Sequence, residues 1–288
     1  MAETKSTVSA SQKPATAGHV AKTSKRGGNL FAVLAVPICL IVAILFYIFV
    51  LGNPANFAGG VRGGIGSEAK ALNYFGVMYT GGPIVPILVS LFLMVITFTI
   101  ERLLTISKAK GKVKPTEFVR RVQYHLANRN IDAALAECDK QRGSVGNVMR
   151  AGLLKYKEMT ENTELTTEQK VLAIQNEIEE STTLELPMLE KNLVFFATIA
   201  PVAVLFGLLG TVLGMIRAFR ALGASGGTDS TQLALGISEA LVNTALGIST
   251  SVLAVIMYNY FTTNIDGITY GIDETGYTLT RSFAAYYK

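Results

Sequence analysis

Four apolar stretches constrain the fold of this chain more than any other feature of its sequence. As helices, all four are long enough to cross about 30 Å of hydrocarbon. They occupy residues 30–51, 83–100, 193–216 and 232–262. Half of the 288 residues are hydrophobic, only 16% are charged, and the mean hydropathy is +0.38. These values predict an all-α polytopic membrane protein that also carries one substantial aqueous domain.

The aqueous part lies between the second and third stretches, at residues 101–192. A dense basic flank opens this segment: Arg102, Lys108, Lys110, Lys112, Lys114, Arg120 and Arg121. The positive-inside rule therefore predicts a cytoplasmic domain. Four spans then place the tails, 1–29 and 263–288, in the cytoplasm, and the connections, 52–82 and 217–231, in the periplasm. Arg217 and Arg220 oppose the rule, but the denser flank outweighs them.

Residues 30–51 have a second interpretation, because basic residues before an apolar core also occur in secretory signal peptides. The core of such a peptide is usually 7–15 residues long, so the longer stretch favours a retained helix. Either interpretation leaves the following segment outside the cytoplasm. Within that segment, Ser67 to Tyr79 is compatible with a short amphipathic helix at the outer interface. Residues 1–29 are rich in Ser, Thr, Ala and Lys, which predicts a disordered tail.

The cytoplasmic domain is predicted to be helical. Pro115 begins one helix, and Asn130 to Lys140 forms the second arm of a helical hairpin that ends at Gly143. Residues 164–190 carry apolar residues near a 3.6-residue period. We expect that segment to continue into the third span as one long helix, bent at Pro187 and Pro201. The favoured role for the domain is a structural stalk.

Glu239 is the only charged residue between Asp229 and Asp266. A carboxylate inside an apolar helix costs a few kcal/mol and usually marks an ion pathway, a relay or a polar partner. At 100° per residue, Asn243 and Thr250 fall within about 40° of Glu239. Such a polar stripe must face protein or water, since lipid would reject it.

Structural hydrogen bonding between helices is the alternative explanation for this stripe, at about 0.6 kcal/mol per contact. It accounts well for Asn243 and Thr250. It accounts poorly for Glu239, because a neutral glutamine would serve at lower cost. A functional role is therefore favoured for Glu239. Thr244 borders the stripe and Gly247 lies on its side.

The third stretch differs from a plain membrane anchor in its small residues. Gly207, Gly210 and Gly214 allow a neighbouring helix to approach closely. Thr211 lies among them and has two interpretations. Its hydroxyl either bonds the carbonyl of Gly207 within its own helix or faces a pore, and residue type alone favours the first.

Several classes of function lack their sequence signatures. The sequence contains no phosphate-binding glycine loop, no metal-spaced His or Cys cluster and no nucleophile–His pair, so we predict neither an enzyme nor a bound cofactor or metal. Its two cysteines imply no disulfide framework. Basic runs lack the interleaved aromatics of a nucleic-acid groove. An ion gradient, at about 2.3 kcal/mol per charge per 100 mV, is the natural energy source.

Two motifs carry a family resemblance. The first is Ala200-Pro201 followed by Gly207-Leu-Leu-Gly-Thr211-Val-Leu-Gly214-Met-Ile. The second is Gly236-Ile-Ser-Glu239-Ala-Leu-Val-Asn-Thr244-Ala-Leu-Gly247. Together they resemble the ExbB/TolQ/MotA proton-channel family, and the ExbB–TolQ branch most of all. The resemblance covers Leu193 to Phe261, whereas the rest of the chain agrees in layout only.

The resemblance implies a ring-shaped homopentamer in the inner membrane of a bacterium with two envelope membranes. Its third and fourth spans would line a pore around a dimer of ExbD-type single-span proteins, whose aspartate carries the proton. Thr211, Thr244 and Glu239 would line the route, and the polar stripe adds Asn243. The residues expected to pack the pore helices are Pro201, Gly207, Gly210, Gly214 and Gly247. Proton flow would energise a TonB-type protein and so drive uptake across the outer membrane.

Two departures from the family pattern keep other functions open. The chain has an extra amino-terminal span, and Leu213 stands where relatives commonly have tryptophan. A TolQ-like cell-envelope motor and a gliding motor are therefore alternatives. A non-conducting scaffold that recruits partners is a rival from another class. A third hypothesis is a transporter subunit in which Glu239 binds a cationic substrate. It is the weaker hypothesis, because the sequences of the four spans contain no inverted repeat.

Overall fold

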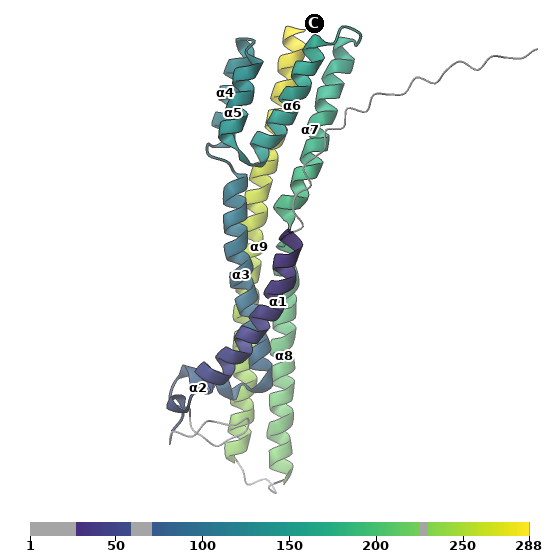
Figure 1. The fold of residues 1–288 in the computed structure, drawn as a ribbon. Coiled ribbons are helices and arrows are strands. Elements are labelled where there is room, and N and C mark those ends of the chain that lie inside the picture. Colours follow the sequence, from purple (N-terminus) through teal and green to yellow (C-terminus); the bar gives the residue numbers. More distant parts are fainter. Residues whose placement is uncertain (1–26, 59–70, 225–229, 288) are drawn as a thin grey trace, which may run out of the picture.

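The computed structural model describes residues 27–58, 71–224 and 230–287 (Figure 1). Four apolar helices are long enough to cross a membrane, within Val33–Leu51, Gly82–Ala109, Thr167–Gly223 and Thr231–Tyr286. Among the described residues, the regular structure is helical apart from one isolated bridge between Phe57 and Ala71. The predicted all-helical architecture with four long apolar helices is therefore confirmed, and the chain is a multi-pass membrane protein.

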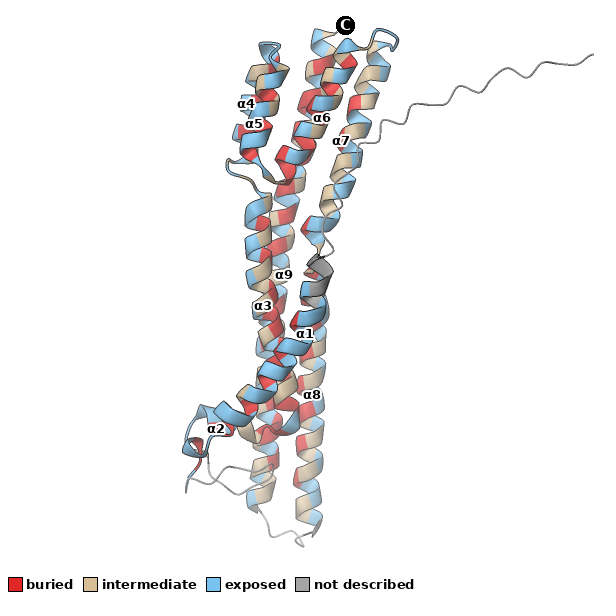
Figure 2. Ribbon diagram, in the orientation of Figure 1, coloured by how far each residue is buried: buried red, intermediate tan, exposed pale blue. Residues whose placement is uncertain are grey.

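The membrane-crossing helices form a long bundle. Helix α1 (Gly27–Leu45) continues into a π-helical segment, Phe46–Leu51, and crosses α3 (Val85–Ala109) at an angle (Figure 1). Helices α8 (Leu193–Ala224) and α9 (Ser230–Tyr286) form an antiparallel hairpin. Much of the outward surface of α1 is exposed and apolar, as expected for a lipid-facing helix (Figure 2).

The other end of the bundle is a helical extension. It contains α4 (Pro115–Ala127), α5 (Ile131–Gln141), α6 (Gly143–Glu161), α7 (Thr167–Glu190) and the last third of α9. The predicted helix starts are confirmed, because α4 begins at Pro115 and the Asn130 side chain caps α5 by accepting a bond from the Ala133 N–H. Thr166 and Gln169 form a reciprocal capping box at the start of α7.

Residues 263–286 are part of a helix, although a tail was expected over residues 263–288. Helix α9 runs for 57 residues without a break, or about 85 Å. Its second half buries an apolar stripe in the extension: Ile265, Ile268, Ile272, Leu279 and Phe283. Spacing of three, four and seven residues places these side chains on one helical face, and the helix is stabilised by what it packs against.

Helices α7 and α8 are separate, although one bent helix was expected. The break lies at Lys191 and Asn192, and Asn192 has a left-handed φ of +67°. Polar contacts hold the chain there. The buried Arg102 guanidinium binds Glu101 and donates to the Leu189 carbonyl at 3.1 Å, and the Asn192 amide donates to Glu101 at 3.2 Å. Both prolines lie inside their helices, so neither forms the break.

The helix expected at the outer interface and the tail expected at the amino terminus both have other bounds in the structure. Helix α2 covers Tyr74–Thr80, where the Asn73 side chain caps its start by accepting a bond from the Gly76 N–H. Part of the expected helix at Ser67 to Tyr79 falls in residues 59–70, outside the described residues. Most of the expected disordered tail, residues 1–26, also falls outside them, and residues 27–29 already belong to α1.

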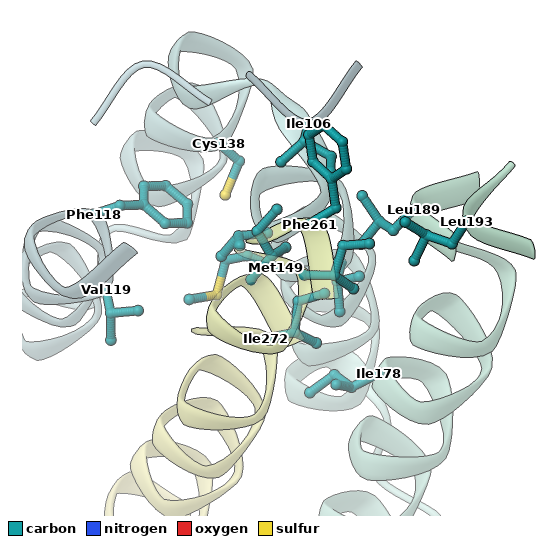
Figure 3. Packing of buried hydrophobic residues seen from close by; sticks show 14 of the residues in the cluster. Ile106, Phe118, Val119, Cys138, Met149, Ile178, Leu189, Leu193, Phe261 and Ile272 are labelled. Carbon is teal, nitrogen blue, oxygen red and sulfur yellow. The ribbon is translucent and has the colours of Figure 1, made fainter. Parts of the chain in front are cut away.

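The core of the extension is apolar and closely packed. Phe118 of α4, Cys138 of α5 and Met149 of α6 point toward one another, and Ile272 of α9 completes the contact (Figure 3). Each of these four side chains is at most 2% exposed. Burial in this core raises the pKa of the Cys138 thiol to about 12.

We expect Cys138 to resist alkylation in the folded protein. A pKa of about 12 leaves roughly a thousandfold less thiolate at pH 8 than an unperturbed cysteine would have, and the thiolate is the reactive form. In a Cys39→Ser variant, N-ethylmaleimide labelling followed by mass spectrometry should be slower than in denaturant by at least that factor. Equal rates in the two conditions would show that this core is not packed as described.

Candidate ion-pathway site

Small residues bring the backbones of α8 and α9 into direct contact. A Cβ atom added to Gly207 would lie 3.1 Å from the Asn243 carbonyl oxygen. One added to Gly247 would lie 2.7 Å from the Ala203 carbonyl oxygen, and one added to Gly214 2.8 Å from that of Gly236. Real Cβ atoms essentially never lie within 3.0 Å of a backbone atom, so the seam requires glycine at positions 214 and 247 and fits tightly at Gly207. Gly210 is equally restricted, because the Asn243 side chain occupies the space that a side chain at position 210 would need.

Glu239 lies near the loop end of this hairpin and forms an ion pair with Arg217 of α8. The Glu239 side chain is 8% exposed, whereas that of Arg217 is 38% exposed. In the sequence, Arg217 stands out only as an exception to the charge rule. A signal was present, however: Arg217 and Glu239 lie equally far from Thr228, and an antiparallel hairpin brings such positions together.

A glycine turn between α2 and α3 covers the ion pair. Gly82 has a left-handed φ of +77°, and a side chain there would collide with the Glu239 carboxylate and lie 3.1 Å from Arg217 Nη1. The neighbouring Gly81 carbonyl accepts a 2.8 Å hydrogen bond from the Asn243 amide. The turn therefore contacts both polar residues at this end of α9.

The extra amino-terminal helix reaches the same turn. Tyr47, in its π-helical segment, stacks on Tyr79 of α2 with ring centroids 4.6 Å apart. Its hydroxyl donates a 3.1 Å hydrogen bond to the Tyr79 carbonyl, two residues before Gly81. These contacts tie the extra span to the segment that covers Glu239. Nothing in a single sequence distinguishes Tyr47 from other membrane aromatics.

The polar stripe of α9 is buried within this one chain. Asn243 and Thr250 are at most 1% exposed, and Glu239 is buried beside Gly82. The Asn243 Oδ1 atom accepts no hydrogen bond among the described residues, and a buried oxygen of this kind costs about 1–3 kcal/mol. The expectation that the stripe faces protein or water agrees with these positions. The protein it faces includes α8 and the Gly81–Gly82 turn.

The two threonines lie elsewhere, at the partly exposed edge of the α8–α9 seam. Thr211 donates to the carbonyl of Leu208 at 2.6 Å, one residue away from the expected Gly207, and Thr244 donates to Ala240 at 3.2 Å. Gly207, one turn from Thr211, lies against the Thr244 backbone, where an added Cβ would be 3.5 Å from the Thr244 Cα atom. Pro201 is on the exposed side of α8 and does not take part in the seam.

The arrangement can hold and exchange charge at membrane depth. It contains a carboxylate, a guanidinium and an amide in surroundings that are otherwise apolar. Across residues 27–58, 71–224 and 230–287, no group of three or more His, Cys, Asp or Glu residues is arranged to hold a metal. The charged groups of the site are the Glu239 carboxylate and the Arg217 guanidinium, which form one ion pair.

These features define a multi-pass helical membrane protein with a close-packed hairpin and a buried ion pair at one end of it. Residues 141–274 match the MotA/TolQ/ExbB proton channel family, and this segment contains α8, most of α9 and Glu239. Through this segment, 134 of its 288 residues, the chain is similar to a family of proton channels.

Individual relatives are similar over shorter segments. A putative ExbB-like protein 3 of Synechocystis is 38% identical over 86 residues, 29% of this chain and 41% of the relative. The TolQ protein of Haemophilus influenzae is 39% identical over 84 residues, 29% of this chain and 37% of the relative. A putative ExbB homologue of Methanothermobacter thermautotrophicus is 24% identical over 200 residues, which are 68% of this chain and 66% of the relative. The matched segments thus span less than two thirds of these relatives.

Proposed function

We propose that this chain is the channel-forming subunit of an inner-membrane motor driven by the proton-motive force. The observation that carries the proposal is the buried Glu239 carboxylate, paired with the partly exposed Arg217 inside an otherwise apolar hairpin. An ionisable pair at this depth is costly, and function is the usual reason for its presence. Water along a hydrated route would also donate to Asn243 Oδ1, which accepts no hydrogen bond among the described residues.

The proposed assembly is a homopentamer around a dimer of ExbD- or TolR-type single-span proteins. Large apolar side chains are exposed along both hairpin helices, among them Leu205, Val212, Leu241 and Val252. They present a surface for lipid and neighbouring copies. Thr211 and Thr244 at the seam edge then line the proton route together with Glu239. The helical extension, residues 101–192 and the end of α9, lies in the cytoplasm.

The outer-membrane process that the motor serves has two candidates. Energising a TonB-type protein for uptake is one, and a TolQ-like role in cell-envelope maintenance is the other. Sequence identity to the TolQ of Haemophilus influenzae, at 39%, differs by only one percentage point from identity to the ExbB-like relative of Synechocystis, at 38%. Identifying the small single-span protein that co-purifies with this chain separates the two, because each motor has its own companion. Recovery of the chain without any such companion would favour the scaffold.

Substitution of Thr244 by valine tests the channel. We expect gradient-driven uptake to fall on the order of tenfold, because the isosteric methyl removes a hydroxyl from the route at a barrier cost of about 1.4 kcal/mol. Assembly with the companion should persist. Thr262→Val is the matched control, since Thr262 is also half-buried in α9 and donates to the carbonyl four residues back. Loss of assembly in Thr244→Val, or equal uptake in both variants, would contradict the proposal.

A further inference from the structure

Three lysines line a cavity where α3 leaves the membrane. The apolar stretch of α3 ends at residue 100, the helix itself continues to Ala109, and Lys110, Lys112 and Lys114 follow within five residues. Together with Asn264 of α9 they line a cavity of about 420 Å³. None of the described residues that line it is acidic. A basic cavity at the membrane boundary is suited to a phosphate group.

The loop that carries these lysines is held in a fixed conformation. The buried Gln141 side chain accepts a 3.0 Å bond from the Val113 N–H and donates a 2.7 Å bond to the Val113 carbonyl. Its own carbonyl accepts from the Lys112 N–H at 3.1 Å. Gly111 takes a left-handed φ of +75° beside it. A preformed loop lowers the entropic cost of binding a ligand.

A second cavity of about 380 Å³ adjoins the first on the membrane side. The two share Lys110 and Asn264, whose side chains are hydrogen-bonded to each other. Beyond them the second cavity is lined mainly by apolar residues of α3 and α9, including Leu103, Leu104 and Tyr260. These three residues are 45–59% exposed in the chain. A cationic cavity thus continues into an apolar groove that runs back toward the bilayer.

We propose that the two cavities bind one anionic phospholipid of the cytoplasmic leaflet. The lysines hold its phosphate, and an acyl chain follows the groove over Leu103 and Leu104. A soluble phosphate compound would use the first cavity alone and would leave the groove unexplained. The membrane supplies anionic headgroups at this depth, on the side that the basic flank marks as cytoplasmic. The bound lipid would join α3 to α9 where both leave the bilayer.

Native mass spectrometry of the full-length protein in detergent provides the test. Wild-type protein titrated with phosphatidylglycerol should retain it in preference to phosphatidylcholine. We expect the Lys110→Gln/Lys112→Gln/Lys114→Gln variant to retain at least about tenfold less, since each lysine near a headgroup contributes about fivefold in affinity. The matched control is Lys140→Gln/Lys155→Gln/Lys157→Gln, which removes the same charge from lysines paired with acids elsewhere in the extension. It should bind like wild type.

The groove is tested by Leu103→Ser/Leu104→Ser, which should weaken phosphatidylglycerol binding while leaving all three lysines in place. Displacement of the lipid by equimolar glycerol 3-phosphate would overturn the proposal in favour of a soluble phosphate ligand. Equal retention by the triple variant and its control would also overturn it. If the triple variant is poorly folded, the Lys112→Gln/Lys114→Gln pair gives the same comparison, because Lys110 then keeps its bond to Asn264.

Discussion

Replacing Arg217 with methionine is expected to destabilise the protein more than replacing Glu239 with glutamine. The pair is asymmetric, because Arg217 is 38% exposed and Glu239 only 8% exposed. Without Glu239, the long arginine side chain can turn toward water. Without Arg217, the carboxylate stays buried under the Gly81–Gly82 turn with no cation beside it. Removing one partner of a buried pair costs about 3–5 kcal/mol, and the partial exposure of Arg217 places this case near the lower limit.

The measurement is the free energy of unfolding in detergent micelles for both single variants and the Arg217→Met/Glu239→Gln double variant. The double variant leaves no buried charge, so it should recover most of the stability that Arg217→Met loses. Arg220→Met is the matched control on the exposed side of α8 and should change little. A larger loss in Glu239→Gln than in Arg217→Met would show that the carboxylate, and not the arginine, reaches water.

The same set of variants separates stability from function. If Glu239 takes part in the proton route, gradient-driven uptake should be abolished in Glu239→Gln and should stay absent in the stable double variant. A purely structural pair predicts the opposite, namely uptake that returns together with stability. The double variant therefore distinguishes the channel from the scaffold even where the single variants assemble poorly.

Arg217, one of the two arginines that oppose the predicted orientation, forms an ion pair with Glu239. The positive-inside rule counts lysine and arginine residues and gives little weight to acidic ones, so this pairing does not remove the conflict. The predicted orientation still depends on the denser basic flank after α3, which outweighs Arg217 and Arg220.

Much of the architecture follows from local sequence, because length and hydropathy decide which segments can cross a bilayer. Glu239 was identifiable for a related reason, since a lone charge in 36 otherwise uncharged residues, 230–265, must have a compensating environment. Gly207, Gly210 and Gly214 predicted close packing, and the structure shows which backbone atoms they approach. These features depend on one helix or on two helices adjacent in the chain.

Contacts between distant segments were not predictable in the same way. The Gly81–Gly82 turn lies more than 150 residues before Glu239, and Tyr47 reaches that turn from a helix that the resemblance does not cover. The end of α9 was assigned to a tail because its polar residues hide the apolar stripe that packs in the extension. The break at Asn192 depends on its contact with Glu101, 91 residues away. Tertiary packing decides each of these cases.

Adding a methyl group to the α8–α9 seam is expected to separate these two helices. In Gly247→Ala the new Cβ would lie 2.7 Å from the Ala203 carbonyl oxygen and 3.0 Å from the Gly207 Cα. Both neighbours are backbone atoms, so no side-chain rotation relieves the clash. We expect the free energy of unfolding in detergent to fall by about 1–3 kcal/mol, the usual cost of overpacking. Gly210→Ala should behave alike, because its Cβ would collide with Asn243 Cβ.

Gly223→Ala is the matched control for this seam. It makes the same substitution in α8, at a position where a new Cβ meets nothing within 4 Å. Because alanine is intrinsically the better helix former by about 1 kcal/mol, this variant should be as stable as wild type or more so. Equal stability of Gly247→Ala and Gly223→Ala would mean that the hairpin tolerates a wider separation. The same helix pair positions Thr211, Thr244 and Glu239, so a seam variant that loses stability should also lose gradient-driven uptake.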